Sequence, residues 1–396
     1  MVESNRVRAE IKKLSPAILD ISRRIFDNPE TNFNERYASE LLANEFEKEG
    51  FKIKRGKGKL KTAFAGEFKG KKSKPSIAIL AEYDALPILG HACGHNMIAA
   101  AAYGAAVAVK NILGEKCGTL KVLGTPAEEG GGGKILMIRE GWFEKLDAAI
   151  MVHPSNKTRV VARMLAVVDI EFHYYGKASH AAAHPELGVN ALDAVINLFN
   201  AVNAMRQQSP NFSKVHGIIT HGGDAPNIIP EYASAKFMVR GLTMPDFELM
   251  KKRLIKCAKG AAESTGCRLK IKKNPVAFHP FEPNRTLGAI FSKHLRKVGL
   301  EDCGLKETDE IGSSDIGNVS QVIPALHPEF AVGDGATAAV NHSREFLKAL
   351  TSKLGNENLL KITEVLTETV LELFTDQTGI KEAQKEFDIF KKRDAG

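Results

Sequence analysis

The sequence has little of several features that define other protein classes. Only five of its 396 residues are cysteines, and no two of them are spaced as C-x-x-C. We therefore expect reduced thiols in a cytoplasmic protein and no disulfide framework. The longest apolar run, residues 97–109, is too short to span a bilayer, and no apolar stretch follows the first residues. We expect neither a signal peptide nor membrane binding.

The charge is not extreme. The chain has 55 Lys and Arg against 47 Asp and Glu, a formal net charge of +8. Its basic residues are spread along the chain except in residues 54–74, which we expect to form a solvated hairpin or loop. A mild basic excess suits anionic small molecules at least as well as nucleic acid. Because no ribonucleoprotein or zinc-finger signature is present, no nucleic-acid partner is expected.

Apolar patterns in the first part of the chain predict an α/β fold. Short apolar runs predict strands, and amphipathic or alanine-rich stretches predict helices. Strands that alternate with helices are typical of a parallel sheet with helical crossovers. The predicted strands are 76–81, 119–124 and 147–152, and the predicted helices are 16–24 (with Ser15 as its cap and Pro16 in its first turn), 35–49, 96–112 and 133–140.

The middle of the chain predicts a second, smaller domain. Its elements follow the order β-α-β-β-α-β, which is that of a ferredoxin-like module. We therefore predict a discontinuous α/β domain formed by residues 1–165 and 277–396, with residues 166–276 inserted as an α+β domain. The strands of this module are expected at 167–175, 216–221, 232–240 and 267–273, its helices at 189–208 and 245–264, and two C-terminal helices at 359–374 and 381–393.

Polar residues follow three of the predicted buried strands. Asp84 follows the first, the pair Glu128 and Glu129 follows the second, and His153 follows the third. In an open α/β sheet, ligands bind beyond the carboxyl ends of the strands, so these side chains are expected to converge. The loop that contains Cys93 and opens the alanine-rich helix falls on the same edge.

These residue types indicate a metal site. Cys93 and His95 are separated by a glycine that lets both face one ion, and a thiolate with an imidazole suits zinc. Of Glu128 and Glu129, one can bind metal while the other takes a proton from water, whose pKa a metal lowers to about 7. Asp84 is placed to orient a ligand histidine.

Each of these signals has a simpler interpretation when it is taken alone. A Cys-Gly-His sequence usually binds nothing, a Glu pair is most often a solvated loop, and a His-Pro after a strand is often a turn. The metal site is favoured because all three fall at strand ends of one sheet.

Segments that resemble other catalytic motifs lack residues that those motifs require. Residues 130–134 resemble a phosphate loop, but that motif needs a glycine where Glu128 stands and Ser or Thr where Ile135 stands. Residues 312–317 place their second glycine one position too late for a nucleophile elbow. No H-E-x-x-H sequence occurs. The glycine run after Glu129 is expected to allow close backbone packing.

Several motifs in fixed order resemble one family. They are Glu-Tyr-Asp-Ala-Leu-Pro at 82–87, His-Ala-Cys-Gly-His-Asn at 91–96, Pro-Ala-Glu-Glu-Gly at 126–130, Gly-Lys-Ala-Ser-His-Ala at 176–181 and Asn-His-Ser at 341–343. From about residue 17 to 375 the chain resembles the dinuclear-metal peptidases and amidohydrolases that include carboxypeptidase G, aminoacylase, hippurate hydrolase and auxin-conjugate hydrolases. The p-aminobenzoyl-glutamate hydrolase and β-alanyl-lysine dipeptidase branch is the most similar, and it also carries the sequence Gly-Ser-(Ser/Thr)-Asp-x-Gly-Asn-Val-Ser found here at 312–320.

This resemblance implies a zinc-exopeptidase-like α/β sandwich with a ferredoxin-like lid and dimerisation domain. It implies two divalent ions per chain, with zinc favoured and manganese or cobalt possible. Glu128 is implied as general base and Asp84 as the orienting aspartate. The residue after Cys-Gly-His is Asn96 where much of the family has Asp, so residue 96 is not assigned as a ligand. The implied metal ligands are Cys93, His95, Glu129, His153 and His342, of which His342 rests on the resemblance alone.

The resemblance also assigns residues of the inserted domain. His180 is expected to stabilise the oxyanion, often in the partner subunit's site, and Asn227 and Arg240 to bind a substrate carboxylate. His221 and, more weakly, Asn190 are further pocket candidates. Residues 313–315 form either an acyl pocket or a structural turn.

The expected function is hydrolysis of small N-acyl amino acids or dipeptides that have a free carboxylate. The substrates would resemble p-aminobenzoyl-glutamate or β-alanyl and basic dipeptides, and the enzyme is expected to be a homodimer joined through the lid. The alternative is a non-catalytic, metal-stabilised binding or regulatory protein.

Overall fold

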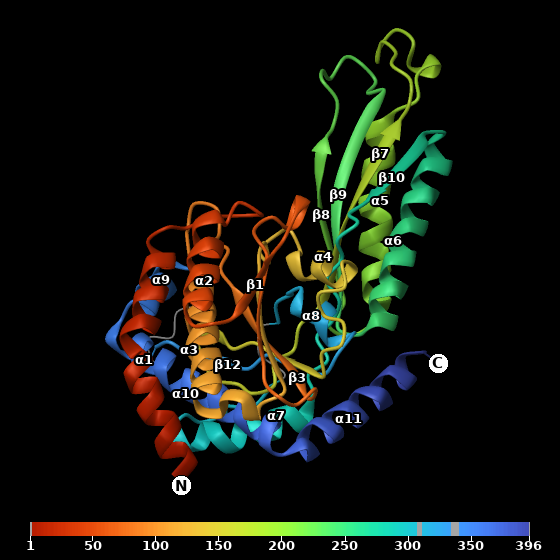
Figure 1. Cartoon of the computed structure of the whole chain (residues 1–396). Coiled ribbons are helices and arrows are strands. Elements are labelled where there is room, and N and C mark those ends of the chain that lie inside the picture. The colour runs from red at the N-terminus through yellow and green to blue at the C-terminus, as the bar shows by residue number, and fades with distance from the viewer. Residues whose placement is uncertain (1, 307–310, 334–339, 396) are drawn as a thin grey trace. The chain divides into compact units, whose positions relative to one another are not determined.

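The computed structural model describes residues 2–306, 311–333 and 340–395 (Figure 1). The chain forms two compact units. Unit 1 comprises Met1–Arg163, Phe281–Glu310 and Ser314–Gly396, and unit 2 comprises Met164–Pro280 and Ile311–Ser313. The breaks lie near the expected limits at 165 and 276, but the sequence pattern did not predict that Ile311–Ser313 joins unit 2.

Unit 1 is built on a six-stranded sheet in the order β1-β2-β4-β3-β5-β11. Strands β3, β4, β5 and β11 are parallel, and β2 is antiparallel to both β1 and β4. All seven residues of β3 are buried, as expected of a central strand covered on both faces. The predicted α/β class is confirmed. The lysine-rich stretch, residues 54–74, includes part of the antiparallel hairpin of β1 and β2. The strands are β1 Lys52–Arg55, β2 Phe64–Lys69, β3 Ser76–Glu82, β4 Thr119–Thr125, β5 Ala148–Ile150 and β11 Ala325–Leu326.

The central helix of unit 1 is α3, His95–Leu113. It packs against α1 (Val2–Phe26) and α10 (Lys353–Thr375), and its small side chains let the neighbouring helices approach closely. At Gly104 a Cβ atom would lie 2.5 Å from Ile18 Cδ1 and 2.8 Å from Thr363 Cγ2. Among the described residues, only His95–Lys116 is long and apolar enough to cross a membrane, and 78% of its most apolar stretch is buried inside the protein.

The remaining elements of unit 1 surround this core. The short strands β6 (His153–Ser155) and β12 (Glu329–Ala331) pair in parallel. The other α-helices are α2 Arg36–Lys48, α4 Gly133–Arg139, α7 Arg285–Leu295, α8 Ile316–Ser320, α9 Arg344–Leu350 and α11 Gln377–Ala395.

The first helix does not begin where the sequence pattern predicted. It begins at Val2, so Pro16 lies inside it and Ser15 is not its cap. Proline has no N–H, which leaves the carbonyl of Lys12 without its usual helical donor. The Ser15 hydroxyl donates to that carbonyl at 2.8 Å. Apolar contacts on both sides of the proline, at Val7 and Ile18, keep the helix continuous.

Unit 2 has the predicted ferredoxin-like order. Its antiparallel sheet runs β10-β7-β9-β8, and one face packs on α5 and α6. Strand β7 alternates strictly, with Val168, Ile170, Phe172 and Tyr174 buried. The elements are β7 Ala166–Tyr175, α5 Ala191–Met205, β8 Lys214–His221, β9 Tyr232–Gly241, α6 Met244–Thr265 and β10 Arg268–Lys273.

The packing at Gly104 gives a stability prediction. Gly104→Leu should lower the free energy of unfolding by about 1–3 kcal/mol, because the side chain has no room beside Ile18. Gly260 is the matched control, since it is also helical but has no atom within 4 Å of the point where a Cβ would lie. Gly260→Leu should instead stabilise by about 0.5–1 kcal/mol. Urea titrations measure the free energy of unfolding of both variants. Equal changes in the two variants would contradict the close packing of Gly104 against Ile18.

Candidate metal centre

The polar residues that follow the strands of unit 1 meet at one edge of its sheet. Asp84 lies just beyond β3 and Glu128 just beyond β4, while His153 opens β6 after the end of β5. Cys93 and His95 lie at the start of α3. Parallel strands therefore bring together residues that are far apart in sequence, as the strand-end argument predicted.

The carboxylate of Asp84 connects two of these segments. Its Oδ1 lies 3.0 Å from His95 Nδ1, and its Oδ2 accepts the backbone N–H of Glu129 at 3.0 Å. Burial tends to raise the pKa of Asp84, but the neighbouring His95 and the N–H of Glu129 outweigh it and lower that pKa. The ionised aspartate thus occupies Nδ1 of His95 and leaves Nε2 for a ligand.

Gly94 makes the turn between Cys93 and His95 possible. Its φ is +85°, and a Cβ atom there would lie 2.4 Å from Pro154 Cγ. Only glycine suits this combination of left-handed backbone and close approach. The tight turn expected from the Cys-Gly-His sequence is therefore present.

The glycine run after Glu129 also packs closely, as predicted. A Cβ at Gly133 would lie 1.9 Å from the carbonyl oxygen of Pro126, and one at Gly131 would lie 2.5 Å from Phe33 Cε2. These glycines let the backbone after β4 fold back on itself and present Glu128 and Glu129 side by side.

Three groups of side chains are close enough to hold ions. They are Cys93 with His95 and His153, Cys93 with Glu129 and His342, and His95 with Glu128 and Glu129. In each group the ligand atoms lie within 4.8 Å of one another. The first two groups contain all five predicted ligands and share Cys93, so these five side chains would hold two ions between them.

His342 reaches this site from a distant part of the chain. Its Nε2 lies 3.4 Å from Glu129 Oε1, and its backbone N–H donates to the carbonyl of Ala92 at 2.9 Å. Its φ is +67°, so the backbone is held in an uncommon conformation at this point. Nothing in the local sequence marks this histidine, and the structure places it beside Glu129.

Two orphaned atoms show that the residues fit a metal. Among the described residues, neither His95 Nε2 nor Glu129 Oε1 makes a hydrogen bond, although both atoms are buried. Each has only a charged neighbour, Glu82 Oε2 at 3.5 Å from the His95 atom and His342 Nε2 at 3.4 Å from the Glu129 atom. Buried polar atoms without partners are rare in native proteins and need an explanation. Thiolate, imidazole and carboxylate are the ligands that zinc prefers, so a divalent ion between these atoms accounts for both.

The site also sets the charges of its members. Burial raises the pKa of the Cys93 thiol, but His95 and His153 outweigh burial and hold that pKa well below its usual range. The two histidines thus favour the thiolate of Cys93, the form that binds metal. Burial, and then the charges of Glu82 and Glu129, raise the pKa of Glu128. Glu128 is thus a stronger base than an exposed glutamate.

Comparison with known proteins identifies the family. Residues 78–372 match the profile of peptidase family M20/M25/M40. The chain belongs to this family. It is 37% identical to the Xaa-Arg dipeptidase of Mus musculus over 96% of this chain and 91% of that protein. It is 30% identical to a subunit of the p-aminobenzoyl-glutamate hydrolase of Escherichia coli K12 over 93% of this chain and 91% of that protein.

Solved structures share the fold. A putative aminohydrolase from methicillin-resistant Staphylococcus aureus superposes with a TM-score of 0.80 at 19% identity, covering 94% of this chain and all of that one. A dinuclear metal-binding M20 peptidase from Bacillus subtilis has a TM-score of 0.71 at 20% identity, covering 92% of this chain and 99% of that one. The resemblance inferred from the motifs is confirmed. As a member of this peptidase family, the protein is a hydrolase.

The lid residues of this M20 protein form two groups within unit 2. His180 Nδ1 accepts the backbone N–H groups of Ala182 and Ala183 at 3.3 and 3.2 Å. With Nδ1 as an acceptor, the neutral form of this ring has its proton on Nε2, which is then a hydrogen-bond donor. Asn227 lies beside this segment, because its carbonyl accepts the N–H of Ala181 at 3.0 Å. Figure 1 shows the loops that follow β7 and β8 together at one end of the sheet.

Arg240 lies at the other end of the same sheet. It pairs with Val167, whereas Tyr232 at the start of β9 pairs with Tyr175. Arg240 is eight steps along the strand from Tyr232, a span of about 26 Å. Its guanidinium donates to Ser313 Oγ at 2.8 Å. Asn227 and Arg240 of one chain therefore lie too far apart within unit 2 to bind the same carboxylate together, contrary to the expectation from the sequence.

The other pocket candidates have local roles. The His221 ring packs edge-on against Tyr232, with centroids 5.1 Å apart, and its Nδ1 accepts the N–H of Gly223. Asn190 is the N-cap of α5, where it accepts the N–H of Leu192 at 2.9 Å. Asp315 is buried and bound by Lys134, which favours the structural-turn interpretation over an acyl pocket.

Two supporting groups were missed by sequence reasoning. Glu35 is fully buried and accepts the N–H of Ala127 at 3.1 Å, which steadies the residue just before Glu128. Lys134, in the glycine run, points its buried ammonium at Glu82 and Asp315. The run Gly130–Lys134 is therefore not a phosphate loop, since its lysine is already paired.

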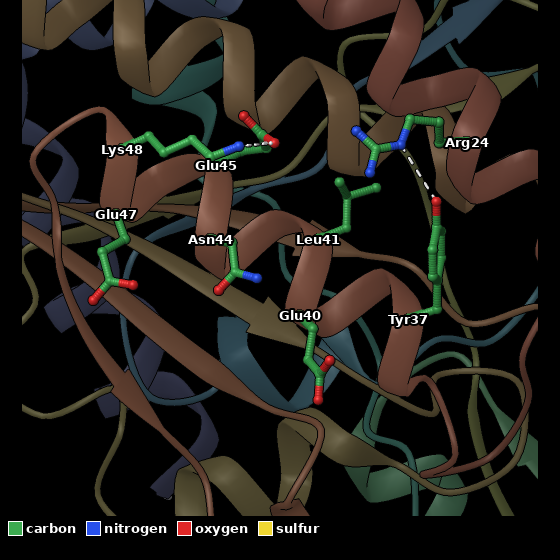
Figure 2. A pocket seen from close by; sticks show the side chains of 8 residues that line it. All are labelled: Arg24, Tyr37, Glu40, Leu41, Asn44, Glu45, Glu47 and Lys48. Carbon is green, nitrogen blue, oxygen red and sulfur yellow. Dashed lines mark hydrogen bonds and ion pairs between the residues drawn. The ribbon is translucent and has the colours of Figure 1, made fainter.

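A surface hollow lies over α1 and α2, away from these residues (Figure 2). Arg24 donates to the hydroxyl of Tyr37 at 3.3 Å, and Lys48 pairs with Glu45 at 2.8 Å. Its lining includes none of the predicted site residues.

The bridging role of Asp84 gives a testable prediction. Asp84→Asn should weaken metal binding about 10–100-fold, because the amide no longer accepts from both His95 and Glu129. Asp147→Asn is a matched control. Asp147 also accepts a backbone N–H, that of Ser76 at 2.7 Å, but it lies before β5, at the amino end of the strands. Zinc titration by calorimetry measures both, and equal affinities in the two variants would contradict the role of Asp84.

Proposed function

We propose that this M20 enzyme hydrolyses the amide bond of small dipeptides or N-acyl amino acids that have a free carboxylate. The observation that carries the proposal is the meeting of five metal-binding side chains and Glu128 around two orphaned buried atoms. The relatives support two substrate classes, since one is named for Xaa-Arg dipeptides and another for p-aminobenzoyl-glutamate. Basic or β-alanyl dipeptides and p-aminobenzoyl-glutamate-like amides are therefore the proposed substrates.

The proposed metal ligands are Cys93, His95, Glu129, His153 and His342. They would hold two divalent ions, with zinc favoured by the thiolate and manganese or cobalt possible. Bound ions supply Lewis acidity and make water acidic enough to lose a proton near neutral pH.

The chain's own groups move the protons and hold the substrate. Glu128 accepts the proton of the attacking water and returns it to the leaving amine. Its raised pKa suits both steps, because it must hold the proton between them. The Nε2–H of His180 donates to the oxygen that becomes negative, and the guanidinium of Arg240 binds the substrate's carboxylate.

We further propose that His180 and Asn227 serve the site of a partner subunit in a homodimer. The span of about 26 Å along β9 supports this, because Arg240 and His180 lie at opposite ends of one sheet. The edge strand β8 exposes Ile218 and Ile219, and α5 exposes Ile196. Exposed apolar residues on an unpaired edge are typical of a subunit interface. A cytoplasmic location, without nucleic-acid or membrane partners, stays a prediction.

Amine release from a substrate panel tests the activity. The panel holds p-aminobenzoyl-glutamate, β-alanyl-lysine, dipeptides ending in arginine, hippurate and acetyl-amino acids. We expect release from one of the first three classes, lost with chelator and restored by zinc, manganese or cobalt. Metal-loaded protein that is silent on the whole panel would instead favour the non-catalytic alternative.

Mixed dimers test the partner role of His180. Homodimers of Glu128→Gln or His180→Ala should lose at least about 100-fold in kcat, and Glu128→Gln should still bind its metals. If His180 acts on the partner's site, a mixed dimer has one intact site. Random mixing of the two variants should then restore about a quarter of wild-type activity, as expected for a two-fold dimer. No recovery in verified mixed dimers would show that His180 acts within its own chain.

A further inference from the structure

A buried three-residue charge cluster lies next to the metal centre of unit 1. It consists of Lys134 at the start of α4, Glu82 at the end of β3, and Asp315 just before α8, and all three are at most 1% exposed. The Lys134 ammonium contacts Glu82 Oε1 and lies 2.6 Å from Asp315 Oδ1. The backbone N–H of Lys134 also donates to Asp315 Oδ2 at 2.9 Å.

This cluster keeps its lysine charged. Burial tends to lower the pKa of Lys134, but the carboxylates of Asp315 and Glu82 outweigh burial and raise it. Taking such charges out of water is costly, and apolar residues of the same volume are often at least as stabilising. A gain in stability alone therefore does not explain why this core contains three charges.

The second carboxylate oxygen of Glu82 explains why the charge cluster lies beside the metal centre. Glu82 Oε2 lies 3.5 Å from His95 Nε2, the orphaned nitrogen that faces the metal site. Zinc sits about 2.0–2.1 Å from a histidine nitrogen and a similar distance from a carboxylate oxygen. A carboxylate at this position reaches an ion on His95 after a small movement. The contact between Glu82 Oε1 and Lys134 opposes that movement.

We propose that Lys134 is a positioning residue of the metal centre, which holds Glu82 beside His95 and keeps it from becoming an additional metal ligand. Asp315 fixes the lysine in turn, because its two oxygens bind the ammonium and the backbone N–H of the same residue. With Glu82 held back, a bound ion would have a position free for water and substrate, which catalytic zinc sites require. This inference rests on the proposed metal centre.

The visible spectrum of the cobalt(II)-loaded protein reports directly on the number of ligands. In Lys134→Met, Glu82 is released, so the intensity of the cobalt bands should fall as the coordination number rises. The value of kcat should fall about tenfold or more, while KM changes less than about threefold. In the double variant Lys134→Met/Glu82→Gln, residue 82 has no carboxylate that could bind the ion. The cobalt spectrum and most of kcat should therefore return to wild-type values.

A matched control separates this role from loss of stability. Lys110→Met removes a half-buried lysine that pairs with Glu49 at 3.4 Å, near the other end of α3 from His95. Its cobalt spectrum should match that of the wild type even if its unfolding midpoint falls. If Lys134→Met does not fold, Glu82→Gln alone serves as the test, since it should keep the wild-type spectrum.

The results separate a failure of the proposed metal centre from a failure of the proposed role of Lys134. Wild-type protein that binds no cobalt would overturn the metal centre and this inference together. A wild-type spectrum in folded Lys134→Met, or a double variant no better than the single one, would overturn only the role of Lys134. A changed cobalt spectrum in Glu82→Gln would also overturn the role of Lys134, because Glu82 would then be a ligand of the ion in the wild-type protein.

Discussion

The carboxylate of Asp84 is the contact on which the catalytic unit depends. One oxygen holds His95 at the start of α3, and the other holds the backbone of Glu129 after β4, while the residue itself follows β3. Three elements of the sheet and its helical layer are therefore locked together at the point where charge must be arranged. The orphaned atoms of His95 and Glu129 follow from this, since each residue is held with its ligand atom turned toward the same space.

Around this contact, the centre is built from charges rather than from a conventional apolar core. The histidine neighbours of Cys93 lower its pKa and favour the thiolate, and Glu128 has a raised pKa through burial and nearby carboxylates. Lys134 and Asp315 add a second, fully buried layer behind Glu82. Such an arrangement is stable only when each charge has a partner, so it favours one geometry strongly over its alternatives. Unit 2 is simpler, an alternating sheet with polar groups at its two ends.

Sequence patterns predicted most of the fold and much of the centre. Short apolar runs located β3 and β4, and the rule that parallel strands end at one edge brought Asp84, Glu129 and His153 together. The start of α1 was missed because Pro16 normally opens a helix, and only its packing shows that the helix runs through it. His342 and the pairing of Lys134 with Asp315 were also beyond local patterns. Each depends on contacts between residues more than 180 positions apart, which no local periodicity encodes.

The most direct test of the account is the anomalous diffraction of crystals grown with zinc. We predict two anomalous peaks per chain, both near Cys93, with ligand distances of about 2.0–2.3 Å. His95 and His153 should contact one ion, and Glu129 and His342 the other. A single peak, or peaks that leave His342 or Cys93 without an ion, would contradict the assignment of the centre.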